Sequence, residues 1–425
     1  MGIKKFILSN DNVERNSYIW NLTGSMLMAF QSVIMLMILM RTLSVVDAGI
    51  FTIAYANANL FLTIGKYGMR NFQVSDLNNQ FSFREYRASR IFTAVVMIVV
   101  SIANIMYNSI HYEYSAYKSL IIMCMCLFKV VDAAEDIYNG LYQKMRRLDM
   151  SSRSMTIRLF ATILVFGIGI IVFKNLLYAL IISTLFTTVF LIVLISWTYK
   201  PYEKEAGDLK NKNVTELLMS CFPLFLGSFL SFYIGSAPKY AIDSLLTDDL
   251  QACYGFISMP VFVIGLLNGF IFNPILYYVS SLWKERKMSL FFKRVFIQIG
   301  IIIGITGICI MGAYFWGIPV LSALYAIDLS GFRKELLILL LGGGFLAMSG
   351  FLNALITIIR FQKIIILGYG VVAVVAYLLS GYMVANYQIM GAAILYTILM
   401  GILCVCFVGM FLAGVIKRNS EFRNK

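Results

Sequence analysis

The sequence predicts an all-α integral membrane protein with about twelve transmembrane helices in two six-helix lobes and both termini in the cytoplasm. Three observations predict this fold. Long apolar segments follow one another from residue 17 to residue 416. The 425 residues are 60% hydrophobic and only 13% charged, whereas soluble domains carry about 25% charged residues. Lysine and arginine also alternate across the series of segments. No soluble core could bury this much apolar surface.

The apolar segments fit the length that a bilayer requires. A transmembrane helix needs about 20 mainly apolar residues. On that criterion we predict spans at 17–40, 48–65, 90–110, 118–141, 157–173, 176–197, 214–237, 252–282, 295–316, 335–358, 364–385 and 390–416. The longest loop on the outer side is then 317–334.

The distribution of basic residues orients the predicted spans. Twenty-eight lysines and arginines fall on one side, among them Arg90, Arg153 and Arg158, and only six fall on the other. The positive-inside rule places the larger set in the cytoplasm. The six are Arg41, Lys118, Lys174, Lys239, Arg333 and Lys334. This rule also accounts for the net charge of +14, so no nucleic-acid partner is expected.

A hydrophilic stretch near the middle divides the chain. We predict a first lobe at 1–198, a cytoplasmic linker at 199–213 and a second lobe at 214–425. Each lobe contains six spans. Because six is even, the lobes have the same orientation and are related by an axis along the membrane normal, with a ligand between them near the midplane.

Short matches at one offset favour an internal repeat. Gly24-Ser25 recurs as Gly227-Ser228, and Leu43-Ser44 recurs as Leu246-Thr247, in both cases 203 residues later. The matches flank the predicted linker, as a duplicated lobe requires.

The fourth span carries the main chemical signal, four charges at Lys129, Asp132, Glu135 and Asp136. Each charge costs about 2.5–3.5 kcal/mol at a helix centre, so these groups cannot face lipid unpaired. Lys129, Asp132 and Asp136 share one helix face, which must meet other helices or a water-filled cavity. Glu135 is offset and is expected to reach the cytoplasmic interface. The charges either serve transport or form a static network that holds the helix in its lobe.

The remaining composition points away from metal and redox chemistry. The seven cysteines lie in apolar segments, and the chain has a single histidine, His111. We interpret the cysteines as small apolar packing residues. No metal and no cofactor are expected.

Several motifs resemble a known family. They are Asn21-x-x-Gly-Ser25, Asp47-Ala-Gly-Ile-Phe-Thr-Ile-Ala54, the segment Gly65 to Asp76, and Pro238-Lys-Tyr-Ala-Ile-Asp243. They resemble the bacterial O-antigen and capsular polysaccharide repeat-unit flippases (Wzx-like) of the multidrug/oligosaccharidyl-lipid/polysaccharide (MOP) exporter superfamily. The resemblance implies export of an undecaprenyl-pyrophosphate-linked oligosaccharide to the outer leaflet of the bacterial cytoplasmic membrane by alternating access. It also implies contact with membrane lipids and with the polymerase of the same pathway.

Candidate site residues follow from this resemblance and from the charges. Lys129 is expected to help hold the diphosphate, while Asp132, Asp136 and Glu135 exchange protons. Weaker candidates for substrate binding lie at span ends: Lys66 and Arg70 on the cytoplasmic side, and Arg41 and Lys239 on the outer side. For these four, ordinary interfacial anchoring is the alternative.

Two other functions stay open. A drug or cation exporter of the same superfamily often has an acidic residue in its first helix, and here no acid lies between Glu14 and Asp47. A membrane polymerase or ligase of the same glycan pathway would be expected to have a large outer domain, and the predicted outer loops are short. The protein is therefore expected to be a transporter and not an enzyme.

Overall fold

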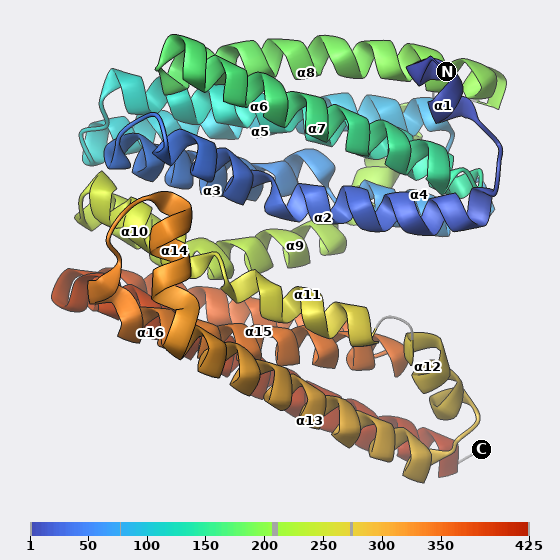
Figure 1. Ribbon diagram of the computed structural model, residues 1–425. Coiled ribbons are helices and arrows are strands. Elements are labelled where there is room, and N and C mark those ends of the chain that lie inside the picture. Colours follow the sequence, from blue (N-terminus) through green and yellow to red (C-terminus); the bar gives the residue numbers. More distant parts are fainter. Residues whose placement is uncertain (1, 77, 206–210, 273–274, 424–425) are drawn as a thin grey trace. The chain divides into compact units, whose positions relative to one another are not determined.

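The structure, a computed structural model, confirms the all-α fold class. It describes residues 2–76, 78–205, 211–272 and 275–423, and helices are the only regular elements within those ranges. Figure 1 shows the helices in chain order. They are α1 (Ile3–Leu8), α2 (Val13–Met40), α3 (Val45–Lys66), α4 (Met69–Ser75), α5 (Phe83–His111), α6 (Ala116–Lys144), α7 (Leu148–Phe173), α8 (Leu176–Thr198), α9 (Asn211–Leu245), α10 (Asp248–Ser258), α11 (Val261–Phe272), α12 (Leu276–Lys284), α13 (Met288–Gly312), α14 (Ile318–Tyr325), α15 (Arg333–Ile358) and α16 (Ile365–Arg423).

The helices are those of a multi-pass membrane protein. Ten stretches in the described ranges are long and apolar enough to cross a bilayer. The charged helix α6 is not among the ten, and the last stretch, Gln362–Arg418, contains two expected spans. These two spans meet at Gln388, whose non-helical backbone (φ 48°, ψ −130°) kinks α16. With α6 added and α16 divided, the helices correspond to the twelve expected spans.

Two local expectations were wrong. The segment 252–282 is not one helix, because α10 ends before Pro260 and α11 begins after it. Proline cannot donate the backbone hydrogen bond that a continuous helix needs. The expected outer loop at 317–334 contains helix α14, which buries Ile318, Leu321 and Tyr325. Their i, i+3, i+7 spacing is helical. Residues 273–274 of the expected span 252–282 lie outside the described ranges.

The chain forms two compact units, Met1–Phe229 and Leu230–Lys425. In the first unit α2 packs on α7, and α6 packs on α3, α5 and α8. In the second unit α15 packs on α16, α11 and α13. The boundary falls within α9, so the first turns of α9 belong to the first unit. Residues 206–210 of the predicted linker lie outside the described ranges, and the lobe limits 1–198 and 214–425 stay predictions.

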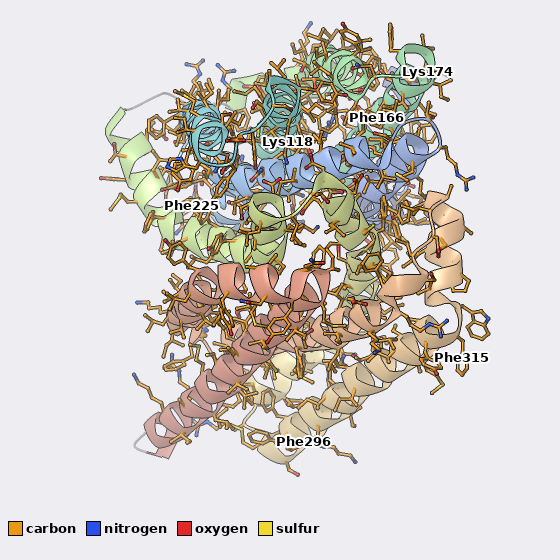
Figure 2. All side chains as sticks on the ribbon, turned by 90° about the vertical axis from the view of Figure 1, so that its left-hand side faces the viewer. Lys118, Phe166, Lys174, Phe225, Phe296 and Phe315 are labelled. Carbon is orange, nitrogen blue, oxygen red and sulfur yellow. The ribbon has the colours of Figure 1, made fainter. Side chains whose placement is uncertain are left out.

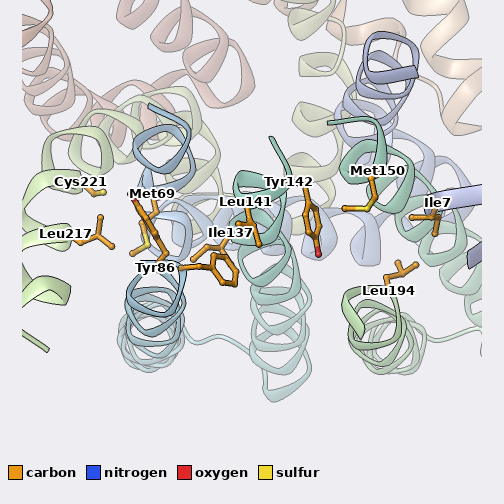
Figure 3. Packing of buried hydrophobic residues seen from close by; sticks show 11 residues of the cluster. Ile7, Met69, Tyr86, Ile137, Leu141, Tyr142, Met150, Leu194, Leu217 and Cys221 are labelled. Carbon is orange, nitrogen blue, oxygen red and sulfur yellow. The ribbon is translucent and has the colours of Figure 1, made fainter. Parts of the chain in front are cut away.

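One apolar cluster ties the start of α9 to the first unit. Leu217 and Cys221 of α9 are buried with Met69 of α4 and with Ile137 and Leu141 of α6. Figure 3 shows these side chains in one cluster, which continues to Ile7 near the N-terminus.

Aromatic stacking extends this contact between α9 and the first unit. Phe225, labelled in Figure 2, stacks on Tyr67 with ring centroids 4.6 Å apart and planes 8° from parallel. The contact places α9 against the turn between α3 and α4.

Helix starts preserve the offset that suggested a repeat. Ser44 caps α3, which begins at Val45, and its hydroxyl accepts a hydrogen bond from the backbone N–H of Asp47. Thr247 occupies the same position before α10, which begins at Asp248. The two starts are again 203 residues apart, in agreement with the internal repeat. Ser and Thr favour this position because they can satisfy backbone donors left free at a helix start.

The outer surfaces of the units are apolar. Phe296 and Phe315 are 68% and 59% exposed, and both lie on the second unit (Figure 2). Phe166 of the first unit is by contrast fully buried. Large exposed apolar side chains are expected where the neighbour is lipid and not water.

The turn at Gly68 provides a test of this packing. Gly68 has φ +66°, and a Cβ built there would lie 2.6 Å from Leu224 Cβ on α9. We expect Gly68→Ala to destabilise the protein by at least about 1–2 kcal/mol, because a left-handed backbone is unfavourable for residues with a Cβ. The thermal unfolding midpoint of the purified protein in detergent measures the effect.

Gly227→Ala is the matched control. A Cβ at Gly227 meets nothing within 4 Å, and alanine is favoured over glycine within a helix. Its midpoint should be unchanged or higher. Equal midpoints for the two variants would contradict both the left-handed turn at Gly68 and its close approach to α9.

Candidate functional site

A polar cavity of about 100 Å³ lies within the first unit. Five of its helices contribute to the wall. The lining residues are Asn21, Ser25 and Met28 of α2, Lys66 of α3, Arg70 of α4, Asp132, Glu135, Asp136 and Asn139 of α6, and Ser151, Ser152 and Met155 of α7. Charged, amide and hydroxyl groups therefore converge on a space within the apolar unit. Such a convergence of polar groups is typical of a ligand site.

Lys129 joins α6 to two neighbouring helices. Its ammonium nitrogen lies 2.9 Å from Asp132 Oδ2, which confirms that these two residues share a helix face. It also donates to Gln31 Oε1 of α2 at 3.1 Å and to Tyr55 Oη of α3 at 3.4 Å. The side chain is only 2% exposed and is not among the cavity-lining residues. Lys129 is thus fully engaged behind the cavity wall.

Arg158 of α7 holds two carboxylates at once. Its Nη2 lies 2.6 Å from Asp132 Oδ1 and 2.8 Å from Glu135 Oε2. Its Nη1 donates to Thr187 Oγ1 of α8 at 3.0 Å. Arg158 is completely buried. Guanidinium–carboxylate bonds are the strong class of hydrogen bond, so this residue links three helices.

Arg90 and Arg70 share the third carboxylate. Arg90 Nη2 of α5 lies 3.0 Å from Asp136 Oδ2, and its Nη1 donates to the carbonyl of Gly65. Arg70 Nη1 lies 4.0 Å from Asp136 Oδ1, and the Arg70 side chain is 29% exposed. Arg70 is therefore the more accessible and the less tightly paired of the two arginines.

The charges around the cavity do not cancel. Five cations, Lys66, Arg70, Arg90, Lys129 and Arg158, accompany three carboxylates, Asp132, Glu135 and Asp136. The excess is two positive charges. The three carboxylates line the cavity together with Lys66 and Arg70. Arg90, Lys129 and Arg158 pair with these carboxylates from behind the wall, so Lys66 and Arg70 are the cations of the surplus that a ligand in the cavity can reach.

Three basic residues that were counted on the cytoplasmic side of the spans are buried within the protein. Arg90, Arg153 and Arg158 are 3%, 2% and 0% exposed. Glu135, which was expected at the cytoplasmic interface, is 4% exposed and bound to Arg158. The sequence showed that the acids of this span need partners from other helices, but it did not identify those partners. Arg90 and Arg158 lie at or within the edges of apolar segments, where such partners occur.

The other two predicted residues, Arg41 and Lys239, are not among those that line the cavity. Arg41 is exposed at the C-terminal end of α2, and it is not among the lining residues. Lys239 is half-buried in the part of α9 that belongs to the second unit. In the described ranges no group of three or more His, Cys, Asp or Glu residues is placed to hold a metal ion.

The fold is shared with known membrane transporters. The lipid II flippase MurJ has a TM-score of 0.71 at 13% identity, with 93% of this chain and 90% of that chain covered. A variant of the Vibrio cholerae MATE transporter VcmN has a TM-score of 0.60 at 11% identity, with 96% of each chain covered.

A third structure with this fold is a MOP superfamily transporter from Pyrococcus furiosus. Its TM-score is 0.55 at 12% identity, with 98% of this chain and 96% of that chain covered. The chain therefore shares its fold with all three of these transporters.

The sequence defines the family within this class. A family model described as "polysaccharide biosynthesis protein" matches residues 15–283, which is more than half of the chain. The protein belongs to this family. The match agrees with the expected resemblance to a polysaccharide family, and the fold is one that the MOP superfamily transporter from Pyrococcus furiosus shares. No curated protein matches the sequence.

The buried network makes a prediction about stability. Arg158→Met removes the shared partner of Asp132 and Glu135, and breaking a buried ion pair in this way costs about 3–5 kcal/mol. We expect a markedly lower thermal unfolding midpoint, with partial recovery in Arg158→Lys because the charge remains.

Lys287→Ala is the control for loss of an ion pair as such. Lys287 lies 2.8 Å from Glu285, but both side chains are more than half exposed. Its midpoint should not change. A small effect of Arg158→Met, similar to that of Lys287→Ala, would contradict the structural role of Arg158.

Proposed function

We propose that the protein is a flippase that moves undecaprenyl-pyrophosphate-linked oligosaccharide repeat units from the cytoplasmic to the outer leaflet of the bacterial cytoplasmic membrane. The observation that carries the proposal is a polar cavity within an apolar unit, where buried cations already pair with the lining carboxylates and Lys66 and Arg70 remain to meet an anion. A diphosphate is the anionic part of such a lipid, and the family match supports a polysaccharide precursor as the substrate. The product would serve O-antigen or capsule synthesis.

Lys66 and Arg70 are the residues we assign to diphosphate contact. Both line the cavity, and arginine presents parallel N–H donors that match phosphate oxygens. Lys129 supports them by adding positive charge behind the wall and by fixing Asp132. Hydroxyl and amide groups of Ser25, Ser151 and Asn21 would accept or donate hydrogen bonds with the polar headgroup.

Arg41 and Lys239 have a different proposed role. Both were assigned to the outer ends of corresponding spans. In alternating access they would meet the headgroup at the outer mouth of the transport route, after it leaves the cavity.

The direction of transport is favourable without a second ion. Moving one charge through the membrane potential changes its energy by about 2.3 kcal/mol per 100 mV. An inside-negative potential drives negative charge outward. For a diphosphate with about two negative charges, outward movement lowers the free energy by about 4–5 kcal/mol per 100 mV. Proton coupling through Asp132, Asp136 and Glu135 is a further component of the proposal, and it requires that an ion pair of the network open during the cycle.

The alternatives make different demands on the cavity. A cation exporter needs carboxylates that are free to bind a cation, whereas the three that line this cavity are paired with Arg90, Lys129 and Arg158. The Pyrococcus furiosus transporter is described as having a binding pocket of reverse polarity that suggests a different function, so pocket polarity is informative within this fold. A polymerase or ligase remains the alternative from the class of enzymes.

Gene deletion in the native host tests the function. We expect lipid-linked repeat units to accumulate inside the cell and surface polymer to disappear. Complementation with Lys66→Gln or Arg70→Gln should restore at most about a tenth of the polymer, because loss of a charged hydrogen bond costs about 1.5–3 kcal/mol. Quantification of both glycans by mass spectrometry and gel analysis is the measurement.

Lys287→Gln should complement fully, because Lys287 is exposed in the second unit. Normal surface polymer in the deletion strain, together with greater sensitivity to cationic dyes, would instead support a drug exporter.

Asp132→Asn tests proton coupling. In vesicles that contain the purified protein, this variant should lose the dependence of transport on a pH gradient, because its amide cannot exchange a proton. Binding of inorganic diphosphate, measured by calorimetry, should persist. If Asp132→Asn transports with the gradient dependence of the wild type, Asp132 does not couple protons to transport.

A further inference from the structure

One stripe of α6 carries Asp136, Gly140 and Gln143, which are spaced as i, i+4 and i+7 and so lie on one helix face. All three approach Arg70 of α4. Gln143 Oε1 accepts from Arg70 Nη2 at 2.9 Å and from Arg70 Nε at 3.3 Å. Asp136 Oδ1 lies 4.0 Å from Arg70 Nη1. The guanidinium is therefore held on two edges by residues of the same helix.

Gly140 provides the space for this arrangement. A Cβ built at Gly140 would lie 3.4 Å from Arg70 Cγ. It would also overlap the amide group of Gln73, which is only 2% exposed. The aliphatic part of Arg70 consequently lies against α6 at the one position of the stripe without a side chain.

The apolar cluster fixes the distance between the two helices. Met69, next to Arg70, is fully buried in that cluster, as is Leu141, next to Gly140 (Figure 3). The helix α4 is short, Met69–Ser75, so the burial of Met69 determines the position of the neighbouring Arg70 backbone. Packing sets the backbone of Arg70, and the stripe sets its guanidinium.

The chemistry of Gln143 suits a support for an anion-binding arginine. Its amide oxygen accepts two N–H groups without adding negative charge to the site. A carboxylate at the same place would neutralise Arg70 and compete with phosphate. A long side chain fixed before the ligand arrives loses less conformational entropy on binding.

We propose that Gln143 and Gly140 are positioning residues that hold the Arg70 guanidinium ready for the phosphate groups of the substrate. This inference rests on the proposed function, in which Arg70 contacts the diphosphate.

A double-mutant cycle tests the inference on the full-length protein in detergent, with inorganic diphosphate as the probe and calorimetry as the measurement. Gln143→Leu should weaken binding by about tenfold, because it removes a hydrogen bond to a charged group. In an Arg70→Met background the same change should have no further effect, since no guanidinium remains to be positioned. Gly140→Ala should also weaken binding in the presence of Arg70.

Two readouts separate positioning from a structural role. Thermal unfolding midpoints of Gln143→Leu and of Gln362→Leu, a control at an exposed glutamine of the second unit, should match that of the wild type. Gln143→Glu should bind diphosphate more weakly than the wild type, with an affinity that depends less on salt because the added charge neutralises Arg70.

The outcomes distinguish the inference from the proposed function. If the wild type binds diphosphate and Arg70→Met weakens this binding while Gln143→Leu does not, the positioning role is wrong and the proposed site stands. An equal loss from Gln143→Leu with and without Arg70 would also overturn it. If Arg70→Met leaves diphosphate binding unchanged, the assignment of Arg70 in the proposed function fails, and the inference fails with it.

Discussion

The first unit depends on one constraint: the acids of α6 must be paired inside an apolar environment. Arg158 meets most of this requirement, because its guanidinium binds Asp132 and Glu135 and also reaches α8 through Thr187. Isolated charges in low dielectric are costly, and they persist only when paired and hydrogen-bonded. The requirement brings α5, α6, α7 and α8 into one arrangement, since each supplies a partner. The cavity exists where these paired groups leave space.

The static and functional interpretations of the α6 charges are compatible in this geometry. Lys129, Asp132 and Arg158 are engaged with one another and make the unit rigid. Lys66 of α3 and Arg70 of α4 face the cavity from the adjoining helices. A rigid support with an unbalanced charge at its surface is what anion binding requires, because the support prevents the cations from collapsing onto the acids. The network thus contributes to the binding step by holding the cations in place, and proton coupling would open one of its ion pairs at another step of the cycle.

Repetition and divergence both appear in the chain. The starts of α3 and α10 keep the same spacing as the matched dipeptides, yet the second half breaks its corresponding segment at Pro260 and extends α13 into α14. Buried charge also differs, since the described network of ion pairs lies in the first unit. If the halves are the repeat that the offset indicates, the described ion-pair network belongs to the first of them.

The sequence by itself determined the fold class, the number of spans and the need to pair the charges of α6. Hydropathy and charge act locally along the chain, so a span or a misplaced acid can be recognised without knowing its neighbours. Only the tertiary structure decided which cations pair with those acids. Arg90 and Arg158 are 46 and 23 residues away from their partners Asp136 and Glu135. Helix packing brings them together, and their position at the edges of apolar segments does not reveal which acid each of them binds. The support of Arg70 by Gln143, 73 residues away, is hidden from sequence for the same reason.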